Sequence, residues 1–178
     1  MDFIGQIRTK ARSLNRTIVL PEGNDERIVK AAEIITKEGI SKVVLLGDPD
    51  EISEVAGDIN LAGVEIINPK DSPKLEEYTS KCYEMRKEKG VTKQDALEIM
   101  KDPLYYGNMM VRRGDADGLV AGALNTTGDV LRPAFQIVRT SPGTSIVSSA
   151  FIMIVPNCNL GADGIFFFAD CAANPNPT

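Results

Sequence analysis

The sequence predicts an α/β fold, a three-layer α/β/α arrangement with a mostly parallel sheet, and three observations support this prediction. Short β-branched apolar runs alternate with segments of helical periodicity over the first 140 of the 178 residues. The apolar runs end in glycine, proline or polar turns, which is typical of buried strands. Parallel strands need helical crossovers that cover both faces of the sheet. The content of 43% hydrophobic and 25% charged residues fits such a globular protein.

The alternation begins near the N-terminus. Residues 1–15 predict a short amphipathic helix, because apolar side chains recur on one of its sides. Residues 16–23, RTIVLPEG, predict a buried strand. A helix follows, with Asn24 as its expected N-cap and Gly39 at its end. The next elements are predicted to be a strand, a short helix and a strand, at residues 42–48, 49–57 and 64–69.

Helical spacing then predicts three helices in the middle of the chain. Residues 73–89 form a long one, with apolar residues near a single stripe. Thr92 opens the second helix, and the Asp102–Pro103 step separates it from a third that continues to Gly114. The alternation of strands and helices therefore extends well beyond the first three strands.

The pattern changes near residue 140. A fourth strand at 117–123 and a helix at 127–139 complete a predicted first α/β domain, residues 1–140. After it, SIVSSAFIMIVP and DGIFFFAD predict two long apolar strands with no helix between them. Two strands alone cannot form a stable subdomain. We therefore expect residues 141–178 to be the opening strands of a second, incomplete α/β domain.

Charge and composition exclude several classes of function. The net charge of −5 argues against nucleic acid as the main partner. No apolar run approaches the ~20 residues that span a bilayer, and the N-terminus lacks the features of a signal peptide, so we expect a cytoplasmic protein without a membrane partner. The chain has no histidine, and its three cysteines lack metal-site spacing. We expect no metal site, and acid–base chemistry by carboxylate, lysine, tyrosine or cysteine.

The stretch GALNTTGDVLRPAF, residues 122–135, contains the strongest candidate site. In open α/β sheets, ligands lie beyond the carboxyl ends of the strands, and helix N-termini there attract anions. Thr126 and Thr127 offer hydroxyl groups, and Gly128 allows a ligand to approach the backbone. Arg132 adds a guanidinium that suits a phosphoryl oxygen. The stretch therefore predicts an anion site for a phosphorylated ligand.

Each candidate residue also has a structural interpretation. A threonine before a helix commonly caps it, and Arg132 is spaced to pair with Asp129 on a solvated face. Arg86 lies near a helix C-terminus, where a cation offsets the helix dipole, although cofactor phosphates attract the same residue type. Cys158 lies in a turn without a neighbouring base, so we favour a structural or pocket-lining role for it. The residues alone predict an anion site but no reaction.

Several segments resemble the phosphate acetyl/butyryltransferase family, and within it the phosphate acetyltransferases. They are DGLVAGALNTTGDVLRPAFQIVRT, YEMRKEKG, SAFIMIVPNC and FADCAANPNPT, and the similarity starts at IVLPEGNDERIVKAA. The resemblance implies reversible acetyl transfer, acetyl-CoA plus phosphate giving acetyl phosphate plus CoA, without a metal or a tightly bound cofactor. It also implies two α/β domains related to the isocitrate/isopropylmalate dehydrogenase architecture, with a cleft between them, and a homodimer.

The resemblance assigns roles to individual residues. Arg132 matches the arginine of the family's LRP motif, implicated in binding substrate phosphate or CoA, and Arg86 matches an arginine with a similar role. Thr126 and Thr127 match the hydroxyl pair of the acetyl phosphate site. Cys158 matches a cysteine near the cleft that is not the nucleophile.

Two departures from the family pattern stand in the site: Val130 replaces a frequent threonine, and Gly128 a frequent alanine. The family's catalytic aspartate and a Ser-Arg pair lie beyond Thr178, so the sequence resembles the N-terminal half of a family member. No residue of this chain takes the catalytic role. We expect the 178-residue chain by itself to be inactive or nearly so. The alternatives are a phosphate butyryltransferase, or a CoA- or acyl-phosphate-binding fragment without catalysis.

Overall fold

The chain forms two compact units, and each is described by itself. One comprises Phe3–Arg139, and the other contains the chain from Thr140 onward. In the computed structural model, the described residues are 2–144 and 146–171. Position 145 and residues 172–178, which fall in the predicted second domain, lie outside the described residues.

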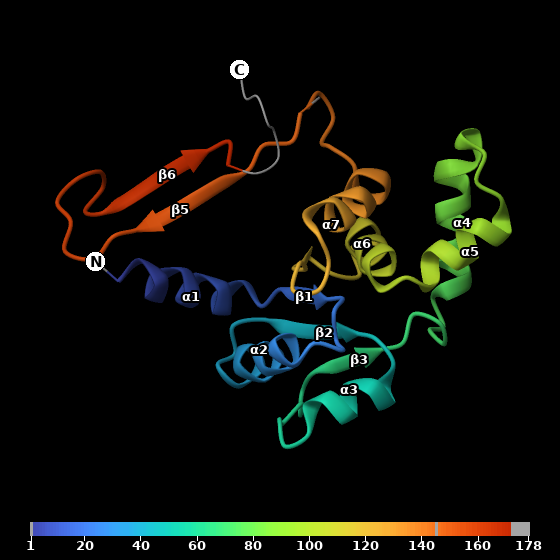
Figure 1. Ribbon diagram of the computed structural model, residues 1–178, viewed down its shortest axis with the longest axis horizontal. Helices are drawn as coiled ribbons and strands as arrows, with labels where there is room; N and C mark the ends of the chain where they lie inside the picture. Colours follow the sequence, from blue (N-terminus) through green and yellow to red (C-terminus); the bar gives the residue numbers. More distant parts are fainter. Residues whose placement is uncertain (1, 145, 172–178) are drawn as a thin grey trace. The chain divides into compact units, whose positions relative to one another are not determined.

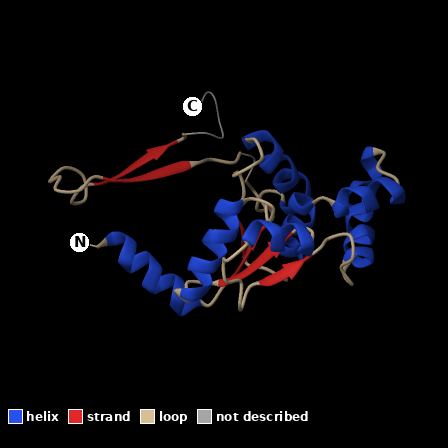
Figure 2. Ribbon diagram, turned by 60° about the horizontal axis from the view of Figure 1, so that its bottom comes forward, coloured by secondary structure: helices blue, strands red, loops and turns tan. Residues whose placement is uncertain are grey.

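A four-stranded parallel sheet lies at the centre of the first unit, with strand order β3-β2-β1-β4 (Figure 1). The strands are β1 (Thr17–Leu20), β2 (Lys42–Leu46), β3 (Glu65–Ile67) and β4 (Gly118–Leu119). Helices cover the sheet on both sides (Figure 2). The predicted α/β class with a mostly parallel sheet is confirmed.

The helices were predicted with nearly the right order and number. The described α-helices are α1 (Phe3–Leu14), α2 (Glu26–Lys37), α3 (Pro49–Ala56), α4 (Leu75–Arg86), α5 (Lys93–Lys101), α6 (Pro103–Arg113) and α7 (Thr127–Pro133). A 3₁₀ turn at Lys87–Lys89 extends α4, and a π-helical turn, η2 (Ala134–Val138), extends α7. The predicted helix at 127–139 is thus two pieces. Its change of helical form starts directly after Pro133, which lacks a backbone N–H.

N-cap side chains determine where several of these helices begin. Thr92 and Asp95 form a capping box at α5, and Asp102 caps α6 by accepting the N–H of Leu104 at 2.8 Å. The expectation that Asn24 caps α2 is wrong. Asp25 is the cap, because its carboxylate accepts the N–H of Arg27 at 2.9 Å.

Two hydrophobic clusters lie on opposite faces of the sheet, because successive strand residues point to opposite sides. One cluster contains Val19 of β1 and the inward side chains of α4, α5 and α6, including Tyr78 and Met109. The other contains Leu20 and the inward residues of α2 and α3, including Ile52. The two central strands, β1 and β2, therefore have buried side chains on both faces, as expected for a parallel sheet.

The register of β1 brings two segments that are distant in sequence to one edge. Ile18 pairs with both Val43 of β2 and Gly118 of β4. Since the strands are parallel, the chain leaves β1 and β4 at the same edge of the sheet. The predicted fourth strand was too long, because after Val120 the backbone turns away from the ladder to contact Glu22.

In the second unit, β5 (Ala150–Ile154) and β6 (Ile165–Ala169) form an antiparallel hairpin, with Ile152 opposite Phe167. Apolar side chains on both of its faces are exposed: Phe151 is 55% exposed and Phe167 70%. Among the described residues of both units, no helix has the length and apolar character needed to cross a bilayer.

Candidate functional site

The candidate site lies at the loop that connects β4 to α7, at the carboxyl edge of the sheet. Residues 120–126 leave β4 there, beside the segment that follows β1. This is the edge at which ligands bind in open α/β sheets. Arg132 lies on the short α7 helix that the loop introduces.

A buried glutamate holds this loop. Glu22 is only 2% exposed, and its two carboxylate oxygens accept five hydrogen bonds. One oxygen accepts the backbone N–H groups of Gly122 and Ala123, both at 2.9 Å. The other accepts the N–H of Leu124 at 2.9 Å, the N–H of Asn125 at 3.0 Å and the Asn125 side-chain amide at 2.8 Å.

These hydrogen bonds determine the charge of Glu22. Burial alone raises the pKa of a carboxyl, but the donors from Ala123, Asn125 and Leu124 outweigh it and lower the pKa of Glu22 to about 2. Glu22 is therefore ionised at neutral pH. Four consecutive amides of the loop are taken by a protein carboxylate, so the part of the backbone left for a ligand begins at Thr126.

Arg27 contacts the same loop from α2. Its guanidinium donates to the carbonyl oxygen of Ala123 at 2.7 Å and to the carboxylate of Asp25 at 2.6 Å. Asp25 is 7% exposed, and the Arg27 side chain lowers the pKa of its carboxyl. Sequence reasoning missed Glu22, Asp25 and Arg27. An acidic residue in the turn after a buried strand, with Asp and Arg a few residues later, is the pattern that could have indicated them.

Thr126 caps helix α7, which is the structural interpretation of this residue. Its hydroxyl accepts the N–H of Asp129 at 3.3 Å and donates to the Asp129 carboxylate at 2.6 Å, so it caps α7. Thr127 and Gly128 are exposed beside it. A Cβ placed on Gly128 would meet only the Thr126 hydroxyl, at 3.8 Å, so the space around this backbone is open.

The side chain of Arg132 is largely exposed. Its side chain is 63% exposed, and its guanidinium lies 3.9 Å from the Asp129 carboxylate. The predicted pairing with Asp129 therefore forms, but an exposed pair at this distance contributes little.

The charges of Arg86 and Arg132 both influence the ionisation of Tyr105. The Tyr105 hydroxyl, on α6, donates to the side-chain oxygen of Gln136 at 2.9 Å. Burial raises the pKa of Tyr105, and the positive charges of Arg86 and Arg132 both oppose this increase. Within the described residues, the Nε of Arg86 is buried without a hydrogen-bond partner. Arg86, on α4, therefore has an unused donor, and Arg132, on α7, has an exposed guanidinium.

Comparison with known proteins decides what kind of protein carries this arrangement. The family model described as phosphate acetyl/butaryl transferase matches residues 2–178. The chain belongs to this family. The predicted resemblance is therefore confirmed.

Relatives in the phosphate acetyl/butaryl transferase family are similar along nearly the whole chain. The phosphate acetyltransferase of Acetivibrio thermocellus is 55% identical over 99% of this chain and 53% of its own length, and that of Thermoanaerobacterium thermosaccharolyticum is 54% identical over 99% and 54%. A phosphotransacetylase structure from Streptococcus pyogenes gives a TM-score of 0.90 at 38% identity, covering all of this chain and 54% of that one. The EutD phosphotransacetylase from Staphylococcus aureus gives 0.87 at 37%, covering 99% and 52%. The chain spans about half the length of these relatives.

Cysteines occur in both units of this family member. Cys158 is half-buried in the second unit, and Cys82 is buried in the first, where burial raises the pKa of its thiol. Within residues 2–144 and 146–171, no group of three or more His, Cys, Asp or Glu residues could hold a metal ion.

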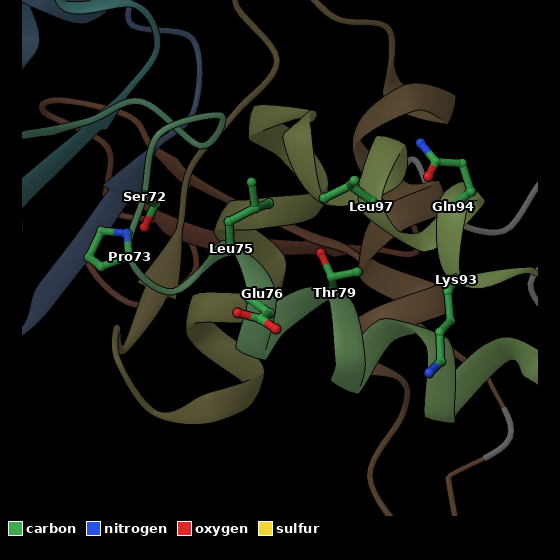
Figure 3. A pocket seen from close by; sticks show the side chains of 8 residues that line it. All are labelled: Ser72, Pro73, Leu75, Glu76, Thr79, Lys93, Gln94 and Leu97. Atoms are coloured by element: carbon green, nitrogen blue, oxygen red, sulfur yellow. The ribbon is translucent and has the colours of Figure 1, made fainter.

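A groove of about 480 Å³ lies between α4 and α5, away from the predicted residues (Figure 3). Thr79 of α4 and Leu97 of α5 face it from opposite sides, and the start of α4 closes one end. None of the residues predicted to bind substrate lines it. The groove is therefore a separate feature, and it provides an internal comparison for ligand binding at α7.

Proposed function

We propose that the protein to which these residues belong is a phosphate acetyltransferase, which moves an acetyl group reversibly between CoA and phosphate. The observation that carries this proposal is the identity of 54–55% with two phosphate acetyltransferases over 99% of the chain. In the direction of acetyl-CoA formation, the CoA thiolate attacks the acetyl carbonyl of acetyl phosphate. The new C–S bond forms, the C–O bond to phosphate breaks, and phosphate leaves with the electron pair.

The proposed substrate site comprises Thr126, Thr127, Gly128 and Arg132. The Arg132 guanidinium binds the phosphoryl oxygens and stabilises the charge that develops on the leaving phosphate. The Thr127 hydroxyl donates to the same oxygens, and the open backbone at Gly128 admits them. Thr126, whose hydroxyl proton is donated to Asp129, holds the start of α7 beside them. Support comes from the exposure of the Arg132 side chain, at 63%, and from the open space beside Gly128.

CoA carries phosphates of its own, and we propose that Arg86 and Arg132 bind them. The unpartnered Nε of Arg86 and the 63% exposure of the Arg132 side chain support this assignment. We assign no catalytic base within the chain and no tightly bound cofactor. Cys158 is proposed to line the cleft rather than to act as a nucleophile.

The organisation of the whole protein is part of the proposal. Residues 1–140 would be the larger part of a first α/β domain, and residues 141–178 the opening strands of a second. The compact unit Phe3–Arg139 and the apolar side chains on both faces of the β5–β6 hairpin support this division. A cytoplasmic homodimer, with small-molecule substrates and without a nucleic-acid or membrane partner, completes it.

The test is acetyl-CoA formation from acetyl phosphate and CoA, followed by thioester absorbance, with the protein expressed from its natural gene. Arg132→Gln should lower kcat/KM about 100-fold, since it removes a charge-assisted contact to the reacting phosphoryl group. Arg113→Gln is the matched control, because Arg113 is also an exposed arginine in an ion pair, with Glu77 at 2.9 Å. Equal activity of both variants would refute the role of Arg132.

The same assay separates the alternatives. Butyryl phosphate used faster than acetyl phosphate would make the protein a phosphate butyryltransferase, the other activity in the family's name. The polypeptide of 178 residues should bind these ligands with little or no turnover. Turnover by it at ~10 per second, an ordinary enzyme rate, would contradict that expectation.

A further inference from the structure

The segment after β1 and the segment after β4 are joined by polar contacts among protein groups that lie outside the proposed substrate-binding residues. Glu22 accepts four consecutive backbone N–H groups and one side-chain amide from residues 122–125. Arg27 donates to the carbonyl oxygen of Ala123 at 2.7 Å. Asp25 holds Arg27 by contacts of 2.6 and 3.0 Å. These three residues are called the loop clamp below.

We propose that the loop clamp positions Thr126 and the start of α7, so that Thr127 and Arg132 meet the phosphate-bearing ligand in a fixed geometry. Glu22 and Arg27 are positioning residues in this proposal and do not touch the ligand. The inference rests on the proposed function, because that function supplies the ligand.

The clamp fixes one peptide unit at both of its polar atoms. The carbonyl of Ala123 and the N–H of Leu124 belong to the same planar group. Arg27 holds the carbonyl at 2.7 Å, and Glu22 holds the N–H at 2.9 Å. The plane of this peptide is therefore fixed from two sides. The cap residue Thr126 follows Leu124 by only two positions.

The charges of the clamp are arranged so that they do not oppose an anionic ligand. An unpaired buried carboxylate is costly and would repel phosphate. The Glu22 carboxylate is instead surrounded by five donors, all from the loop it holds. Arg27 has its charge matched by Asp25. A misplacement of ~1 Å at a reacting site can cost ~100-fold in rate, which gives a reason for so many contacts.

Asp117 offers a matched control. Its carboxylate also joins the chain near β1 to the chain near β4, by accepting the N–H of Thr17 at 2.8 Å and a contact from Arg16 at 2.5 Å. Asp117 precedes β4 and Thr17 begins β1, so these contacts lie at the opposite edge of the sheet from the clamp. Asp117→Asn therefore weakens the same strand pair without touching the ligand loop.

The experiment compares Glu22→Gln, Asn125→Ala and Asp117→Asn with the wild type, in the protein expressed from its natural gene. Asn125→Ala is the milder variant, because it removes only one of the five donors to Glu22. It is expected to fold, so it keeps the test valid if Glu22→Gln fails to fold. Two quantities are measured: hydrogen-exchange rates of the amides at Gly122–Asn125, and the dissociation constant for acetyl phosphate. Glu22→Gln should raise both by about tenfold or more, and Asn125→Ala by about threefold, from the loss of charged hydrogen bonds. Asp117→Asn should leave both within about twofold.

Three results would overturn the clamp. One is an unchanged dissociation constant in Glu22→Gln while the wild type binds acetyl phosphate. Another is an equal loss of affinity in Asp117→Asn, which would make the effect one of general stability. The third is unchanged exchange at Gly122–Asn125 in Glu22→Gln. If the wild type neither binds nor converts acetyl phosphate, the proposed function fails, and the positioning of that ligand fails with it. Exchange rates then still show whether Glu22 holds the loop.

Discussion

Replacing Glu22 by glutamine tests the physics of the site most simply, through protein stability. The pKa of Glu22 is lowered from 4.5 to about 2, and the side chain is 2% exposed. At ~1.4 kcal/mol per pH unit, the ionised carboxylate contributes ~3 kcal/mol to the free energy of unfolding at pH 7. Glutamine loses this charge and directs an amide N–H₂ toward backbone donors, so Glu22→Gln should destabilise by at least that amount.

The pH dependence gives the sign of the effect. Because the pKa is lower in the folded state than in the unfolded state, the contribution is complete above pH ~4.5 and is lost as the pH falls toward ~2. At pH 3 only ~1.4 kcal/mol of it should remain. Urea unfolding followed by circular dichroism, at pH 7 and at pH 3, measures both values for wild type and variant. If the difference in unfolding free energy between wild type and variant is the same at both pH values, the reasoning is refuted. That result would mean that folding does not lower the pKa of Glu22.

Three further predictions concern the elements around the site. Thr126→Ala should cost about 1 kcal/mol of stability by removing the cap of α7, and Thr126→Ser should recover most of it, measured by urea unfolding. Gly107→Ala should cost about 1–3 kcal/mol in thermal or urea unfolding, because the added Cβ would lie 2.7 Å from Leu119 on the sheet; an unchanged midpoint would contradict this packing. Cys82 should be the last of the three cysteines to react with a thiol reagent under native conditions, because it is buried and burial raises its pKa, whereas the described Cys158 and Cys171 are half-buried; labelling of Cys82 first would contradict this.

Much of the fold follows from local patterns in the sequence. The capping box at Thr92 and Asp95, the Asp102–Pro103 break and the glycine at 114 all marked boundaries that the structure retains. These features act over a few residues, so the sequence displays them directly. The length of β4 could not be predicted in this way. Its apolar run continues to Ala123, but Glu22, about a hundred residues earlier, takes those amides and ends the ladder.

The position of the candidate site in the fold could be predicted from the sequence, but the contacts that hold its loop could not. The position of residues 125–132 after a strand and before a helix pointed to the carboxyl edge of the sheet, where the structure has them. The identity of the groups that occupy the loop amides depends on contacts between distant segments. No spacing in the sequence shows that Glu22 and Arg27 both contact Ala123.

Titration with acetyl phosphate, followed by backbone amide chemical shifts, tests the central claim most directly. Our account predicts shifts concentrated at Thr127, Gly128 and Arg132, which Arg132→Gln removes and Arg113→Gln leaves in place. Shifts confined to the groove between α4 and α5, around Thr79 and Leu97, would contradict it.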